Sequence, residues 1–265
     1  MMFNWPLALN GLLLLCAMAS LTWLISLLKR DVSIVDSVWS LFFAAALLLW
    51  WYSGGDNGVR ALVAAILIGL WSSRLCLYLT WRNWGQPEDR RYQLIRERNQ
   101  PHYGLKSLII VFILQALLAW IIALPILPVL KSTSPWSWLD TIGVLFFLIG
   151  LSFETIADGQ MARFRADPQQ QGKVMSAGLW RYSRHPNYFG ECVLWWGFYG
   201  LTMGAGAPVW ILVSPLLITF LLMKVSGVPM LEQDLIPRRP AYQDYIRRTS
   251  AFLPMPPRST QDRQP

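Results

Sequence analysis

Long apolar runs without charged side chains constrain this sequence more than any other feature. The first of them, residues 7–28, contains no Asp, Glu, Lys or Arg. About 20 consecutive apolar residues in a helix cross the hydrocarbon core of a bilayer. Only 14% of the chain is charged, compared with about 25% in an ordinary soluble domain. We therefore predict an all-α, polytopic integral membrane protein with about seven transmembrane helices. The predicted spans cover residues 7–28, 37–52, 61–79, 108–130, 139–157, 188–203 and 209–223.

The first run could instead belong to a cleaved signal peptide, since Ala17, Met18 and Ala19 resemble a cleavage site. No basic residue precedes the run, however, and it continues well beyond Ala19. Signal peptides begin with a positively charged region and have a shorter apolar one. We therefore expect a retained helix, one membrane-embedded domain over residues 1–258, and a frayed polar tail over residues 259–265.

The distribution of basic residues predicts how the chain is oriented in the membrane. With seven spans, 20 of the 23 Lys and Arg residues fall on one side, whereas Arg60 and Lys131 fall on the other and Arg74 lies within a span. Basic residues are enriched in cytoplasmic loops. We therefore expect the N-terminus outside and the C-terminus in the cytoplasm, in a bacterial inner membrane. The same distribution accounts for the net charge of +8 without a nucleic-acid partner.

Metal-binding and disulfide frameworks are not indicated. The three cysteines, Cys16, Cys76 and Cys192, all lie in apolar segments and lack the paired spacing of a zinc site or a disulfide scaffold. The chain has only two histidines, His102 and His185. The sequence also lacks a Walker loop, a GxGxxG fingerprint and a nucleophile elbow. A nucleotide, if bound, is therefore expected between helices and loops.

The most polar stretch beside a predicted span covers residues 178–191 and reads GLWRYSRHPNYFGE. Polar groups at a membrane boundary are costly unless water, phosphate or a polar ligand satisfies them. Its basic side chains suit phosphate groups, and the amide, ring and carboxylate that follow suit the rest of a nucleotide. These residues are Arg181, Arg184, His185, Asn187, Tyr188 and Glu191. The alternative, a basic loop at the membrane surface, accounts for the arginines but not for Asn187 and Glu191.

An acidic helix precedes this motif. Glu154, Asp158 and Arg165 are spaced by four and seven residues, which places them on one face of a helix. Two carboxylates and a guanidinium are therefore expected together at the cytoplasmic end of the fifth span. The alternative is an ion pair that anchors the helix at the interface.

Three further polar features of the sequence are candidates for the site or its surroundings. Asp36 opens the second span, where it is either a site residue or an acid stabilised by the helix dipole. Arg74 lies within the third span and needs an acid or a wet cavity, for which Glu154 and Asp158 are candidate partners. Residues 241–254 predict an amphipathic segment folded against the cytoplasmic mouth.

The motif, the acidic helix before it and the closing stretch YQDYIRRTSAFLP resemble the steroid 5α-reductase superfamily. Within it they are most similar to the bacterial branch of membrane proteins called the DUF1295 group. The early stretch DVSIVDSVWS and the loop WRNWGQPEDRRY resemble the same branch, so the resemblance covers most of the chain. Part of the motif is shared with isoprenylcysteine-type carboxyl methyltransferases, which bind S-adenosylmethionine. The continuation Asn-Tyr-x-Gly-Glu favours the reductases.

The resemblance implies a seven-helix fold and the NADPH-dependent reduction of a carbon–carbon double bond conjugated to a ketone. The substrate would be a steroid-like or isoprenoid lipid, and hydride would reach the β-carbon, as in 3-oxo-5α-steroid 4-dehydrogenases. The implied cofactor contacts are Asp158, Arg165, Trp180, Tyr182, Arg184, His185, Asn187, Tyr188, Glu191 and Tyr245. The superfamily polarises the ketone with a protein acid. Asp36 and Tyr78 are our candidates for that role, with Glu154 and Arg74 lining the cavity.

Two alternatives remain open at this stage. One is an S-adenosylmethionine-dependent methyltransferase of a lipid or lipidated substrate, and the other is a non-catalytic lipid-binding protein. NADPH carries a 2′-phosphate and a pyrophosphate, so the arginines around the motif favour the reductase. We expect a lipophilic substrate and membrane lipid as partners, and neither nucleic acid nor metal.

Overall fold

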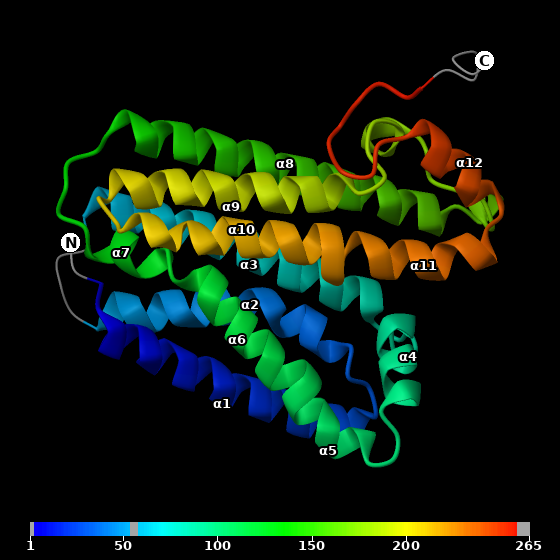
Figure 1. Ribbon diagram of the computed structural model, residues 1–265, viewed down its shortest axis with the longest axis horizontal. Coiled ribbons are helices and arrows are strands. Elements are labelled where there is room, and N and C mark those ends of the chain that lie inside the picture. The colour runs from blue at the N-terminus through cyan, green and yellow to red at the C-terminus, as the bar shows by residue number, and fades with distance from the viewer. Residues whose placement is uncertain (1–2, 54–57, 259–265) are drawn as a thin grey trace. The chain divides into compact units, whose positions relative to one another are not determined.

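The computed structural model describes residues 3–53 and 58–258 (Figure 1). The chain falls into two compact units, which we describe separately. Unit 1 comprises Met1–Thr141 and Tyr199–Ser214, and unit 2 comprises Ile142–Phe198 and Pro215–Pro265. All regular elements of the described residues are helices, so the predicted all-α class is confirmed. The single domain over residues 1–258 stays a prediction, and the tail 259–265 lies outside the described residues.

The first part of the chain contains three long helices followed by shorter elements. They are α1 (Trp5–Lys29), α2 (Ile34–Tyr52), α3 (Val59–Asn83), α4 (Arg90–Arg98), α5 (Tyr103–Ser107), the π-helical η1 (Leu108–Ile113), α6 (Leu114–Ala123) and α7 (Ile126–Lys131). The later elements are α8 (Trp138–Ala166), η2 (Pro168–Gln170), η3 (Gly178–Arg181), α9 (Pro186–Gly204), η4 (Val209–Leu212), α10 (Val213–Phe220), the π-helical η5 (Leu221–Val225), α11 (Val228–Arg238) and α12 (Ala241–Arg248).

Six of the described helices are long and apolar enough to span a membrane. They are Trp5–Lys29, Ile34–Tyr52, Val59–Asn83, Tyr103–Ala123, Trp138–Ala166 and Val209–Arg238. The predicted polytopic membrane architecture is confirmed. The predicted sixth span corresponds to α9, a 19-residue helix that is not among the six because Asn187 and Glu191, and to a smaller degree Trp, Tyr and Gly, lower its mean hydropathy. The predicted orientation in the membrane stays a prediction.

Indole nitrogens join the helices of unit 1. Trp50 on α2 donates to the carbonyl of Leu7 on α1 at 2.9 Å, and Trp120 on α6 donates to the carbonyl of Ala8 at 2.7 Å. A Cβ at Gly11 would lie 2.6 Å from the Trp50 ring, so this glycine lets the indole approach α1. Because lipid is as apolar as the helices, such close packing and interhelical hydrogen bonds set their register.

A buried ion pair in unit 1 joins Arg60 on α3 to Asp140 on α8. The Arg60 guanidinium donates to both carboxylate oxygens of Asp140, at 2.7 and 2.9 Å. It also donates to the Ser132 hydroxyl and the Ser134 carbonyl, each at 2.9 Å. Arg60 is one of the two basic residues expected on the sparsely charged side of the membrane. In the predicted topology, its pairing with Asp140 leaves that side with little net charge.

Glycines bring α8 and α9 together in unit 2. A Cβ on Gly150 of α8 would lie 2.4 Å from the backbone nitrogen of Leu194, and one on Gly197 of α9 would lie 2.4 Å from that of Phe147. Residue numbers increase along α8 where they decrease along the facing part of α9, so the two helices are antiparallel. Small residues allow this close backbone approach in membrane helices. The contact aligns the start of α9, which carries the motif, with the second half of α8.

Replacing Gly197 by Ala tests this contact. Because its Cβ would press on α8 backbone, we expect Gly197→Ala to lower the free energy of unfolding by about 1–3 kcal/mol, as overpacking does. The matched control is Gly159→Ala on α8, whose Cβ would meet nothing within 4 Å and which should be neutral or slightly stabilising. Thermal unfolding of the detergent-purified variants measures both. Equal melting temperatures would contradict the packing.

Candidate functional site

Arg184 ties the predicted motif to the C-terminal part of unit 2. Its guanidinium donates to the two carboxylate oxygens of Glu232 at 2.7 and 3.2 Å. It also donates to the carbonyls of Ile246 and Thr249, at 3.2 and 2.5 Å. Its backbone nitrogen donates to the carbonyl of Ser250 at 2.9 Å. The guanidinium, which the sequence predicts as a cofactor contact, therefore serves here to hold α11 and the residues after α12.

His185 lies between the same carboxylate and an aromatic ring. Its Nε2 is 3.1 Å from Oε1 of Glu232. Its imidazole stacks on Tyr188, with the ring centroids 5.4 Å apart and the planes 3° from parallel. The residue is buried. Glu232 and Tyr188 thus fix the position and plane of the imidazole, and both His185 and Tyr188 lie at the start of α9.

The helix α12 and the residues after it cover the motif. The Tyr245 hydroxyl donates to the carbonyl of Trp180 and, at 3.3 Å, to that of Ser183. The Ser183 hydroxyl donates to the carbonyl of Phe252 at 2.8 Å. Burial raises the pKa of Tyr245, so its hydroxyl remains a donor at neutral pH. Of the amphipathic segment predicted for residues 241–254, residues 241–248 form α12, whose buried residues are Tyr242 and Tyr245.

Asp158 and Asn187 bring a carboxylate and an amide together. The Asn187 amide nitrogen is 3.3 Å from Oδ1 of Asp158, which is buried. The Asn187 carbonyl oxygen is also buried and accepts no hydrogen bond from the described residues. A buried acceptor left unsatisfied costs about 1–3 kcal/mol. This oxygen is therefore suited to a donor that does not belong to the chain, such as an amide or a hydroxyl of a ligand.

Two further carboxylates lie nearby along α8 and α9. Glu191, one turn after Asn187, accepts a hydrogen bond from the Trp195 indole at 3.1 Å. Glu154 is buried on α8, where its backbone nitrogen would be 2.6 Å from a Cβ on Gly190. Both acids are therefore held at the α8–α9 contact.

The remaining predicted cofactor residues lie at the edge of this cluster. The Trp180 indole donates to the carbonyl of Ala157 at 3.0 Å and is buried. Tyr182 is 42% exposed, and Arg165 is exposed near the end of α8. All ten predicted cofactor residues thus belong to unit 2. Their contact with a cofactor stays a prediction.

In unit 1, α4 places a tyrosine and an arginine against Asp36. The Tyr92 hydroxyl donates to Oδ1 of Asp36 at 2.5 Å and accepts from the Gln115 amide at 3.0 Å. The Arg91 guanidinium donates to Oδ2 of Asp36 at 2.7 Å. Burial, and next the charge of Asp36, raise the pKa of Tyr92 well above its ordinary value. The phenol therefore stays protonated at neutral pH.

Arg91 also holds the turn that precedes α4. It donates to both carboxylate oxygens of Asp89, at 3.0 and 3.1 Å. Burial is the largest single influence and would raise the pKa of Asp89, but the hydrogen bonds and positive charge of Arg91, together with the charge of Arg82, lower that pKa overall. The Asp89 side chain also accepts from the backbone nitrogen of Arg91 at 2.9 Å, which caps α4. The position of Tyr92 is therefore fixed by its neighbour in the chain.

The two candidates for polarising the ketone, Asp36 and Tyr78, have different partners in the structure. Tyr78, on α3, lies beneath the guanidinium groups of Arg74 and Arg82, 5.4 and 5.9 Å from its ring centroid. The tyrosine that hydrogen-bonds Asp36 is Tyr92, which is not among the catalytic residues predicted from the sequence. The one available signal was its place in the loop WRNWGQPEDRRY, which shares the family resemblance. The predicted pairing of Arg74 with Glu154 or Asp158 joins separately described units and stays a prediction.

Comparisons with known proteins identify a family whose description assigns no function. The family model described as "Protein of unknown function (DUF1295)" matches residues 22–249. A Schizosaccharomyces pombe protein described as "Uncharacterized protein C594.04c" is 26% identical over 219 residues, which cover 71% of this chain. The match spans 62% of that relative's length, which is less than two thirds. No solved structure matches the chain.

Removing the Arg184 guanidinium should loosen α12 and the residues after it, which together form the C-terminal cover of the motif. Breaking a buried ion pair from one side costs about 3–5 kcal/mol, because the remaining charge is left uncompensated. We therefore expect Arg184→Gln to lower the melting temperature and to expose the segment after α11 to limited proteolysis. Arg247→Gln, which removes an exposed arginine of α12, is the control and should behave as the wild type. Unchanged proteolysis of Arg184→Gln would show that other contacts hold the cover.

Proposed function

Because the chain belongs to the DUF1295 family, a group consistent with a steroid 5α-reductase-like membrane branch, we propose that it is an NADPH-dependent membrane reductase. The substrate is a lipophilic enone, either steroid-like or isoprenoid, and the reduced bond is the carbon–carbon double bond conjugated to its ketone. The observation that supports this most is the pair of Asp158 and Asn187. The side-chain oxygen of Asn187 is buried and accepts no hydrogen bond from the described residues. The proposed location is a bacterial inner membrane, with the cofactor site facing the cytoplasm.

The residues of unit 2 fit a dinucleotide. The Asn187 carbonyl suits the carboxamide of a nicotinamide or a ribose hydroxyl, and Asp158 and Glu191 suit further hydroxyl groups. The phosphates of the cofactor require cationic partners, and the exposed Arg165 and Arg181 are suited to this role. Arg184 instead acts as a positioning residue, because its donors bind Glu232 and backbone carbonyls. This assignment differs from the sequence prediction, which gave Arg184 to the cofactor.

Residues of unit 1 suit the other requirement of such a reaction, which is a donor that polarises the ketone. Bound NADPH would supply a hydride for the β-carbon of the enone. The Tyr92 hydroxyl, kept protonated by burial and by Asp36, is our candidate for polarising the ketone oxygen as enolate charge develops there. Asp36 and Gln115 orient that hydroxyl from two sides. Tyr92 thus replaces Tyr78 beside Asp36 in the proposed mechanism.

Cofactor binding is the first test. NADPH should raise the melting temperature of the detergent-purified protein, since a ligand at 100 times its Kd stabilises the folded state by about 2.7 kcal/mol. Asn187→Ala should weaken NADPH binding by about ten-fold, the loss of roughly one good hydrogen bond. Asn10→Ala, at an exposed position of α1, is the control. Stabilisation by S-adenosylmethionine in place of NADPH would instead support a methyltransferase, and no response to either would support a lipid-binding protein.

The proton donor is tested separately. Using a 3-oxo-4-ene steroid as substrate, Tyr92→Phe should lower turnover by about 10²–10⁴-fold, the usual contribution of general acid catalysis. Stabilisation by NADPH should be retained, since Tyr92 is not among the proposed cofactor contacts. Tyr52→Phe, at an exposed position, is the control. Full activity of Tyr92→Phe together with inactive Tyr78→Phe would return the role to Tyr78.

A further inference from the structure

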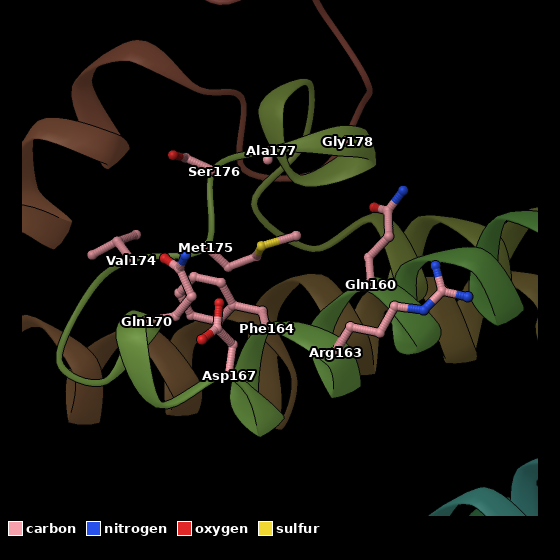
Figure 2. A pocket seen from close by; sticks show the side chains of 10 residues that line it. All are labelled: Gln160, Arg163, Phe164, Asp167, Gln170, Val174, Met175, Ser176, Ala177 and Gly178. Atoms are coloured by element: carbon pink, nitrogen blue, oxygen red, sulfur yellow. The ribbon is translucent and has the colours of Figure 1, made fainter.

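A pocket of about 450 Å³ lies beside the last turns of α8 (Figure 2). It is lined by Gln160, Arg163, Phe164, Asp167, Gln170, Val174, Met175, Ser176, Ala177 and Gly178. The volume lies within the range of about 300–1,000 Å³ that ligand pockets occupy. None of these residues is among the predicted cofactor or catalytic residues. The pocket is therefore a feature that the proposed reductase chemistry leaves unexplained.

The two charged side chains of the pocket are separated. Figure 2 shows Arg163 and Gln160 toward one end, and Asp167 and Gln170 toward the other. Arg163 and Asp167 are four residues apart on the chain, yet they form no ion pair with each other in the structure. In this view Met175 extends between the two ends, and the Phe164 ring lies beside Asp167 and Gln170; both supply apolar surface. The pocket thus offers one cationic and one anionic end joined by an apolar wall.

The same side of α8 is apolar further along the helix. Ile142, Ile149 and Ile156 are 44%, 50% and 50% exposed. They are spaced by seven residues, as are Ile156 and Arg163. Residues seven apart lie within about 20° of each other around a helix. A stripe of exposed isoleucines therefore leads directly to the arginine of the pocket, and at about 1.5 Å per residue it is about 21 Å long from Ile142 to Ile156.

We propose that this pocket binds the headgroup of a phospholipid that carries a primary ammonium beside its phosphate, as phosphatidylethanolamine does, with an acyl chain along the isoleucine stripe. Arg163 and the amide nitrogen of Gln160 donate to the phosphate. Asp167 accepts from the ammonium, which has three N–H donors. The stripe is longer than one leaflet of the hydrocarbon core, about 15 Å, so it accommodates a full acyl chain. This lipid site is independent of the proposed reductase activity.

The charge pattern selects among lipids. An anionic headgroup without an amine leaves Asp167 facing a negative charge. A choline headgroup keeps the positive charge but has no N–H to donate to that carboxylate. An arginine that only extends to the membrane surface would distinguish none of these lipids from one another. Preference among the three headgroups is therefore the property that separates a built site from a surface arginine.

Native mass spectrometry of the detergent-purified protein tests the proposal. After delipidation, the protein is titrated with phosphatidylethanolamine, phosphatidylcholine and phosphatidylglycerol of identical acyl chains. We expect phosphatidylethanolamine to bind most tightly. Arg163→Gln should weaken its binding by about ten-fold or more, the loss of a charge-assisted hydrogen bond. Asp167→Asn should abolish the preference over phosphatidylcholine, and because Asn also caps helices well, the turn at η2 should persist.

Arg247→Gln, at an exposed position of α12, is the control and should bind lipid as the wild type does. Melting temperatures of the four proteins establish that each is folded. Equal affinity of the wild type for the three lipids would overturn the proposal, leaving non-specific lipid only. Retention of the preference in both Arg163→Gln and Asp167→Asn would overturn the assignment to this pocket.

Discussion

The close approach of α8 and α9 is the constraint on which the candidate site of unit 2 depends. Gly150, Gly190 and Gly197 each place backbone against backbone, which fixes the register of the two helices along their length. In this register the start of α9 meets the second half of α8, so Asn187 meets Asp158. A lipid-facing helix pair gains little from burying apolar surface. Close packing therefore determines which polar groups meet, and a shift of one helical turn would separate them.

Arginines serve two different purposes in such a protein. Arg60 and Arg184 are buried, and each is paired with a carboxylate and surrounded by backbone carbonyls. A guanidinium presents five donors, so it can gather several loop carbonyls that would otherwise be unsatisfied near a membrane. Arg163 and Arg165 are exposed and suit mobile ligands. Burial and saturation of donors, which sequence alone does not give, separate structural arginines from binding ones.

The sequence predicts most of the fold, because apolar runs are a local property and each long one forms a helix. It also predicts that residues 178–191 are a polar centre, since their composition is costly at a membrane boundary. The partners of those residues are less accessible to sequence reasoning. Glu232 lies 48 residues from Arg184 and Tyr92 lies 56 from Asp36, and no periodicity links such positions. α9 is an intermediate case: it is a helix of 19 residues whose site residues Asn187 and Glu191, together with its glycines, lower its mean hydropathy.

The network around Asp36 shows how a membrane protein can keep a proton in place. A phenol donating to a carboxylate in a buried setting has its ionisation opposed twice, by lost solvation and by the neighbouring negative charge. Arg91 balances that carboxylate, so Asp36 orients the phenol. A neutral tyrosine in this setting is a weak acid toward water but a well-directed donor toward developing negative charge. That is the property that the proposed reductase requires of its proton donor, and it follows from the arrangement of Asp36, Arg91 and Tyr92.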